Sequence, residues 1–379
     1  MGKYYVMFNP FASNGGGGYV PPGGEGKTFY LANDISNVGL WIRPIGNEST
    51  PFKGVFNGAS HSISGIEMYS GDDYIGLFGY VQSGGHLAQI LNLNVVDCDI
   101  NGANFVGAIC GYIENADILS CAYSGHVVGD DRVGGICGYA VSSNVQGCSN
   151  YGNGYSSVSG DDFVGGIVGE CRSALALCTI DDKVSISGIN YVGGLFGRMM
   201  GNGAYGNQCL SAANEIHGSM YVGGIGGSYI QGHSLGLSDC MNLTSLNLPL
   251  ASCVGGIVGN INTSKISCCY NAGSLSGSIR VGGICANITG GDVSRCYNIG
   301  NVEGSNSGPI TGTINSGGTV SNCFFDKQMC PIDNGYGIGR LTEDMVSYSL
   351  EDDLGASWLY QDDRYPALIN LGFLWAGQS

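Results

Sequence analysis

The sequence predicts an all-β fold, a parallel β-helix (β-solenoid) of about nine three-strand coils with N- and C-terminal caps. The first observation is a repeat: a Val-Gly-Gly-Ile or Val-Gly-Gly-Leu motif returns every 27 to 32 residues, for example at Val133, Val164 and Val192. The second is composition. Glycine supplies 68 of the 379 residues, more than twice its ordinary share, while hydrophobic residues still make up 43% of the chain.

Each repeat contains two further short elements. One ends in a cysteine after an Ile or Val, and the other has the form Gly-x-Val/Ile-x-Gly, as in 300–304. Apolar segments of about four to six residues bounded by Gly, Asn and Ser are typical of strands. Three strands in each repeat make one coil, and coils stacked about 4.8 Å apart bury apolar residues that a single coil would leave exposed. The glycine pair fits a corner where a positive φ or a close backbone approach excludes a side chain.

The chain divides into four parts on this pattern. Residues 1–27 are rich in Gly and Pro and are expected to form a flexible lead-in segment. Residues 28–73 are expected to form the N-terminal cap and the first coils, and 74–330 the regular repeats. Residues 331–379 are expected to form a C-terminal cap with a short helix that starts with Thr342 as its N-cap.

Nine of the sixteen cysteines occupy the same place in successive repeats. We expect this column to be buried free thiols, because parallel neighbours one strand apart do not have disulfide geometry. Zinc is disfavoured, since no Cys-x-x-Cys pair is present and a linear ladder does not make a tetrahedron. The nine cysteines assigned to the column are Cys98, Cys121, Cys148, Cys178, Cys209, Cys240, Cys268, Cys296 and Cys323. A second column holds Cys110, Cys137 and Cys285.

Charge and hydropathy exclude some classes of function. The formal net charge is −16 with only 14 Lys and Arg, and no basic run is present, so nucleic-acid binding is not expected. No apolar stretch is long enough for a membrane-spanning helix. The first ten residues also lack the apolar core and small-residue cleavage site of a signal peptide. Either the protein is not exported by that route, or a signal has already been removed.

In its repeats the chain resembles the family of proteins that carry GLUG motifs. The matching residues are the Val-Gly-Gly-Ile-Val-Gly segments at 164–169 and 254–259, with Ile-Ser-Cys-Cys-Tyr-Asn-Ala-Gly at 266–273. The resemblance implies a bacterial surface or adhesin-type β-solenoid. Some members are IgA-specific metallopeptidases with a His-Glu-x-x-His zinc site. None of the five histidines here is followed by Glu, so that activity is not implied for this chain.

Acidic pairs stand just before two adjacent Val-Gly-Gly corners. Asp130 and Asp131 precede one corner, and Asp161 and Asp162 precede the next, so their carboxylates should stack close together. A Ca²⁺ ion could bridge such oxygens, whereas the alternative is a solvated turn in which Asp serves turn chemistry. No other cofactor is indicated.

Tyrosines near the corners, Tyr80 among them, either bind a ligand or pack between coils, since exposed aromatics on a rigid ladder suit carbohydrate or protein ligands. Four of these tyrosines are the other candidate binding residues. They are Tyr112, Tyr139, Tyr151 and Tyr155.

Three hypotheses for function follow. The first is a non-enzymatic surface or appendage protein, an extracellular adhesin or stalk that binds a glycan or a host protein. The second is a carbohydrate-active β-helix enzyme, a polysaccharide lyase or hydrolase. The four aspartates at 130, 131, 161 and 162 with Arg132 make the only dense charged cluster that could serve it, although no catalytic motif is found. The third is a phage or virion fibre component. The sequence does not indicate an oligomeric state.

Overall fold

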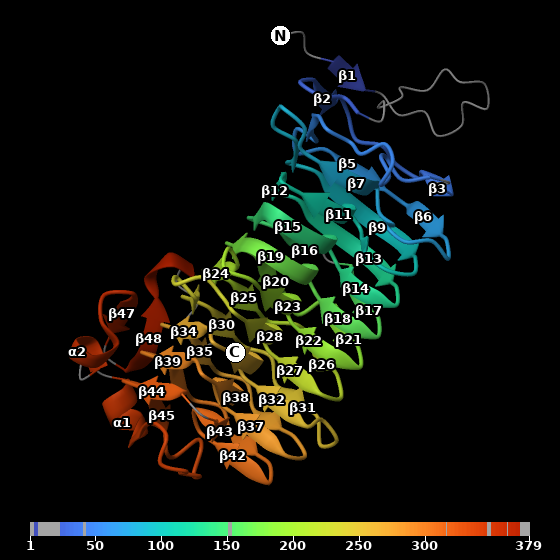
Figure 1. The fold of residues 1–379 in the computed structure, drawn as a ribbon. Coiled ribbons are helices and arrows are strands. Elements are labelled where there is room, and N and C mark those ends of the chain that lie inside the picture. Colours follow the sequence, from blue (N-terminus) through green and yellow to red (C-terminus); the bar gives the residue numbers. More distant parts are fainter. Residues whose placement is uncertain are drawn as a thin grey trace.

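The computed structural model describes residues 4–6, 23–40, 43–150, 154–315, 317–346, 350–361 and 363–371. The chain forms a parallel β-solenoid of about ten turns, which confirms the expected fold class and nearly the expected nine coils. Figure 1 shows the coils stacked into a rod that runs from the N-terminal strands to the C-terminal cap. Among the described strands, only β47 and β48 pair antiparallel.

Three long sheets run along the rod, one for each side of the coil. The first sheet contains β1 (Tyr4–Val6), β2 (Thr28–Leu31), β4 (Val55–Asn57), β7 (Phe78–Gln82), β8 (Gln89–Leu91), β11 (Cys110–Glu114), β12 (Asp117–Leu119), β15 (Cys137–Gln146), β19 (Val168–Ala176), β23 (Phe196–Met200), β24 (Tyr205–Asn207), β28 (Gly226–Ile230), β29 (Leu237–Ser238), β33 (Val258–Asn262), β34 (Lys265–Ser267), β38 (Cys285–Thr289), β39 (Asp292–Ser294), β43 (Thr311–Ile314) and β44 (Thr319–Ser321). The second sheet contains β10 (Val106–Gly107), β14 (Asp131–Gly134), β18 (Asp162–Gly165), β22 (Asn190–Gly193), β27 (Tyr221–Gly223), β32 (Cys253–Gly255), β37 (Arg280–Gly282) and β42 (Asn306–Gly308).

The third sheet contains β3 (Gly39–Leu40), β5 (Ser62–Ser64), β6 (Ile66–Tyr69), β9 (Asn94–Asn101), β13 (Ala122–Val128), β16 (Ser149–Asn150), β17 (Ser156–Ser159), β20 (Thr179–Ile180), β21 (Val184–Ser187), β25 (Leu210–Ser211), β26 (Glu215–His217), β30 (Met241–Asn242), β35 (Tyr270–Asn271), β40 (Tyr297–Asn298), β45 (Phe324–Asp326) and β46 (Ile338–Arg340). A short additional sheet is formed by β31 (Leu246–Asn247), β36 (Leu275–Ser276) and β41 (Val302–Glu303).

The Val-Gly-Gly motif sets the register between coils. Val133 pairs with Val106 on one side and Val164 on the other, and all three side chains are fully buried. The glycine pair is required by close approach. A Cβ on Gly135 would lie 2.1 Å from the Tyr123 ring and 2.3 Å from the carbonyl oxygen of Gly166, and the φ of Gly135 is not positive. The left-handed backbone falls instead on the residue before the valine.

The cysteine column is present, with two corrections to its membership. All sixteen cysteines are buried and free. Cys98 lies outside the column, because it pairs with Gly125. Asn94 pairs with Ala122, so Leu93 is the residue opposite Cys121. Cys269 takes the place expected for Cys268, since Tyr270 is the residue paired with Met241 and Tyr297, and Cys268 adopts a left-handed φ of 51°. The eight members are Cys121, Cys148, Cys178, Cys209, Cys240, Cys269, Cys296 and Cys323.

The ends of the rod are covered differently. At the N-terminus, β1 pairs in parallel with β2, so Tyr4–Val6 lie in the first sheet, and the remaining residues of 1–22 lie outside the described part. At the C-terminus, α1 (Thr342–Met345), α2 (Glu351–Leu354), β47 (Trp358–Gln361), β48 (Arg364–Leu368) and the 3₁₀ turn Ile369–Leu371 gather beside the last coils (Figure 1).

The C-terminal cap covers an apolar row that follows the cysteine column. From Leu210 onward this row reads Leu210, Met241, Tyr270, Tyr297 and Phe324, and it packs with Trp358 in a second hydrophobic core. The buried carboxylate of Asp326 accepts hydrogen bonds from Thr342 Oγ1 and Tyr365 Oη, each at 2.6 Å, which ties the cap to β45. The expected N-cap was wrong, because Leu341 holds that position and the Thr342 hydroxyl binds Asp326.

Candidate functional site

Two rows of aromatic side chains meet along one side of the early coils. The first row is Tyr80, Tyr112 and Tyr139, which are aligned in register on β7, β11 and β15. The Tyr80 and Tyr112 rings stack with centroids 4.4 Å apart, and Tyr112 meets Tyr139 edge-on at 5.2 Å. Offset and edge-on pairs of this kind stabilise each other and fix the ring orientations.

The second row occupies the position just before the Val or Ile of each Gly corner, and its members from Tyr74 to Tyr191 have a left-handed φ. Tyr74 stacks on Phe105 at 4.9 Å, and further along the rod Phe163, Tyr191 and Tyr221 stack at 5.0 and 5.2 Å. The two rows touch, since Tyr74 and Phe105 each contact Tyr112 edge-on. We call the two rows together the aromatic face. Its members are Tyr74, Tyr80, Phe105, Tyr112, Tyr139, Phe163, Tyr191 and Tyr221.

The phenols of Tyr80, Tyr112 and Tyr139 are neutral at physiological pH. Partial burial raises the pKa of Tyr139 to about 12, and burial also raises the pKa of Tyr80 and of Tyr112. The Tyr80 hydroxyl donates to Glu114 Oε2 at 3.3 Å, and that oxygen also accepts from Gln82 at 3.0 Å. The face therefore presents ring surfaces with hydroxyl groups along its edge.

Three arginines lie in or beside the aromatic rows. Arg132 lies between Phe105 and Phe163, with its guanidinium carbon 5.2 and 5.1 Å from their ring centroids. Arg172 and Arg198 lie on β19 and β23 beside the same face, and all three guanidinium groups pair with the buried carboxylate of Glu170. We call Arg132, Glu170, Arg172 and Arg198 the arginine cluster.

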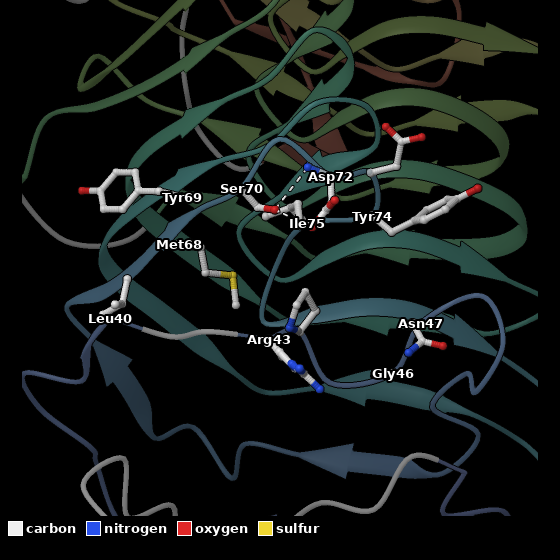
Figure 2. A pocket seen from close by; sticks show the side chains of 12 residues that line it. Leu40, Arg43, Gly46, Asn47, Met68, Tyr69, Ser70, Asp72, Tyr74 and Ile75 are labelled. Carbon is white, nitrogen blue, oxygen red and sulfur yellow. Dashed lines mark hydrogen bonds between the residues drawn. The ribbon is translucent and has the colours of Figure 1, made fainter. Parts of the chain in front are cut away.

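A cavity of about 570 Å³ opens beside Tyr74, at the N-terminal end of the aromatic face. Figure 2 shows Tyr74 and Asn47 on one side, Leu40, Met68 and Tyr69 on the other, and Arg43 and Asp72 between them. Asp73 also lines it and accepts hydrogen bonds from the backbone and side-chain nitrogens of Asn104 at 3.0 and 2.9 Å. The cavity therefore combines apolar, aromatic and charged groups, a combination typical of small-ligand sites.

The structure brings together one pair of the four predicted aspartates. Asp131 and Asp162 are directly paired on β14 and β18, and Asp162 also accepts from the Asn190 amide at 2.8 Å. Partial burial and the neighbouring Asp162 raise the pKa of Asp131. Asp130 and Asp161 are exposed one residue before them. Among the described residues, no group of three or more His, Cys, Asp or Glu side chains is placed to hold a metal ion. Calcium binding stays a prediction.

The four predicted tyrosines fall in different places. Tyr112 and Tyr139 are in the centre of the aromatic face. Tyr155 is 72% exposed before β17 in the third sheet, where its ring contacts the Lys183 ammonium group. Tyr151 lies outside the described residues.

Three members of the arginine cluster, Glu170, Arg172 and Arg198, were not predicted from the sequence. Glu170 and Arg198 follow their Val-Gly-Gly valines by six residues, the offset that also places Tyr112 and Tyr139. Aligning the repeats at this offset would have shown that Tyr112, Tyr139, Glu170 and Arg198 occupy equivalent positions in one outward row. The equivalence was not recognised because these residues differ in chemical type.

No family model matches this chain, and no curated protein matches it. One solved structure that resembles it is that of a candidate immunoglobulin A1 protease from Bacteroides ovatus. The two chains are 19% identical, the alignment covers 90% of this chain and 86% of that one, and the TM-score is 0.36. This similarity is too low to transfer an activity. Membership of the GLUG-repeat family stays a prediction.

The fold defines the class of the protein, which is a parallel β-solenoid with a lateral C-terminal cap. None of the helices in the described part of the chain has both the length and the hydrophobicity that a membrane span requires.

Proposed function

We propose that this chain is a non-enzymatic surface or appendage protein whose aromatic face binds a glycan. The observation that carries the proposal is the unbroken contact from Tyr74 through Phe105 and Tyr112 to Tyr139. All four of these rings are only partly buried, so each leaves part of its surface open to solvent. Exposed aromatic surface in a fixed arrangement is what a binding site offers, because little side-chain entropy is lost on binding.

The geometry favours an extended ligand. Equivalent side chains in successive coils are separated by one strand spacing, about 4.8 Å, so the face offers a repeating series of contacts. A linear polysaccharide also repeats along its length and could contact several coils at once. The cavity beside Tyr74 would accept one terminal or branching sugar at the end of that series.

The non-enzymatic part of the proposal is supported by the chemistry of the face. Burial raises the pKa of the Tyr80, Tyr112 and Tyr139 phenols, and the carboxylate of Glu170 is paired with three guanidinium groups. A general base must come within hydrogen-bond reach of the proton that it abstracts, whereas the Glu170 carboxylate is fully buried and already bound by three guanidinium groups.

The test is a panel of neutral and acidic polysaccharides scored for both binding and cleavage. We expect saturable binding of at least one glycan, with no release of reducing ends or unsaturated sugars. Cleavage of the bound glycan would contradict the non-enzymatic part of the proposal. Absence of binding across the panel would contradict the glycan part.

A further inference from the structure

The arginine cluster concentrates positive charge in an acidic protein. Arg132 Nε and Arg198 Nη2 lie 2.9 and 2.8 Å from Glu170 Oε2, and Arg172 Nε lies 3.0 Å from Oε1. The Glu170 side chain is fully buried, whereas those of the three arginines are 18 to 41% exposed. Three guanidinium groups on one carboxylate leave an excess of two positive charges, in a chain whose formal net charge is −16.

Most hydrogen-bond donors of the cluster remain available. A guanidinium group carries five N–H donors, and Glu170 uses only one nitrogen of each arginine. Within the described part of the chain, the Nη groups of Arg132 and Arg172 have no hydrogen-bond acceptor, and the buried Nε of Arg198 has none either. Unsatisfied charged donors on a half-buried surface favour an incoming acceptor.

Aromatic rings hold the guanidinium planes in place. The guanidinium of Arg198 lies 3.9 Å from the Phe163 centroid, and those of Arg132 and Arg172 both lie 5.6 Å from that of Tyr139. Stacking of this kind orders the side chains before a ligand arrives, so less entropy is lost on binding. A planar guanidinium edge pairs with carboxylate or sulfate oxygens through two parallel hydrogen bonds.

The neighbouring aspartates do not neutralise the cluster directly. Asp131 and Asp162 lie one residue before Arg132 and Phe163, and the charge of Arg132 acts on the Asp131 carboxyl. Among the described residues, the ion pairs of the three arginines are all made with Glu170. The Asp131 and Asp162 carboxylates have the same sign as an anionic ligand and repel it. Only a ligand whose anionic group reaches the guanidinium edges can therefore bind the cluster.

We propose that the arginine cluster binds an oxyanion, the carboxylate or sulfate group of an acidic glycan, and so selects acidic over neutral chains on the aromatic face. This inference rests on the proposed function and names the class of its ligand. The ring surfaces would contact the sugars while Arg132 and Arg172 pair with the charged substituent.

The experiment measures binding of polygalacturonate, dextran sulfate and neutral dextran to the intact protein, and of free glucuronate and sulfate by thermal shift. The variant is Arg172→Gln, because Arg172 is the most exposed of the three and Glu170 keeps two partners. The matched control is Arg280→Gln, which removes a charge in β37 at the position equivalent to Arg132 but away from the cluster. Arg172→Lys keeps the charge and loses the paired donors. Circular dichroism checks the fold of each variant.

We expect an acidic polymer to bind more tightly than dextran, with a loss of about tenfold or more in Arg172→Gln and little change in Arg280→Gln. Equal affinity for acidic and neutral polymers, or equal losses in the two variants, would overturn the inference and leave the glycan proposal standing. Binding of free glucuronate or sulfate that Arg172→Gln abolishes, without binding of any polymer, would support the oxyanion site and contradict the proposed function. No binding of polymer or free anion would contradict both.

Discussion

The Nδ2 of Asn271 donates a 2.8 Å hydrogen bond to the Oδ1 of Asn298 in the next coil, and both side chains are fully buried. Asn242 donates to Asn271 in the same way at 2.7 Å, and each amide also donates to a backbone carbonyl two residues ahead. This buried ladder ties three coils together at the inner side of the third sheet. The ladder lies beside the outward row of Met241, Tyr270 and Tyr297, which the C-terminal cap covers.

Replacing Asn271 should destabilise the rod strongly. Asn271→Leu removes the two inter-coil hydrogen bonds and one backbone bond, and leaves buried groups without partners, which we expect to cost about 2 to 4 kcal/mol in unfolding free energy. Urea denaturation followed by circular dichroism measures it. Asn287→Ala is the control, because Asn287 bonds to Asn260 in a comparable but half-exposed ladder and should cost less than about 1 kcal/mol. Similar losses in the two variants would contradict the role given to burial.

The corner glycines should not tolerate a methyl group. Gly135→Ala places a Cβ within 2.3 Å of a backbone oxygen in the next coil, so the coil must shift, and we expect a loss above about 3 kcal/mol or failure to fold. Gly203→Ala is the control, since nothing lies within 4 Å of the position that its methyl group would take and its φ is not positive. Thermal melts of the two purified variants decide the point, and a Gly135→Ala protein as stable as the wild type would refute the close-approach explanation.

Asp131 should destabilise the folded protein at neutral pH and not in acid. Its pKa is raised in the fold, so the charged form is disfavoured and the cost is present above the folded pKa and absent below the unfolded one. We therefore expect Asp131→Asn to raise stability near pH 7 by less than about 1 kcal/mol, because the carboxylate is partly exposed. The difference should vanish near pH 3. A constant difference across a pH series of melts would contradict this account, and Asp130→Asn is the exposed control.

The thiols should be unreactive in the folded protein. All sixteen are buried, which keeps a reagent away from the sulfur atoms, and burial also raises the pKa of Cys98, Cys171 and Cys285 to about 12, so these three hold little thiolate at neutral pH. Titration with a thiol reagent should give almost no reaction before denaturation and sixteen equivalents after it. Leu250→Cys, at a side chain that is 89% exposed, provides the reactive control. Rapid labelling of several native cysteines would show that the column is open to solvent.

The fold could be predicted because the repeat fixes the register, so aligning the valines of successive coils also aligns most of the residues beside them. Cys98 and Cys268 were misassigned for local reasons. In the coil of Cys98, Leu93 fills the column position instead. Cys268 and Cys269 are adjacent, and only the alternation of side chains along the strand decides which of the two points inward. The arginine cluster needed the same register applied to outward residues, where no shared residue type marks the row. The lateral position of the cap depends on how Trp358 meets Tyr297, a contact between distant parts of the chain.

The aromatic face is the surface that we propose binds the ligand. Titration calorimetry of the best-bound glycan with wild-type protein, Tyr112→Ala and Tyr155→Ala tests this assignment. Tyr112 contacts four other rings of the face, whereas Tyr155 is exposed in the third sheet. We predict a loss of at least about 2 kcal/mol in binding free energy for Tyr112→Ala and almost none for Tyr155→Ala. Unchanged affinity in a folded Tyr112→Ala protein would contradict the assignment.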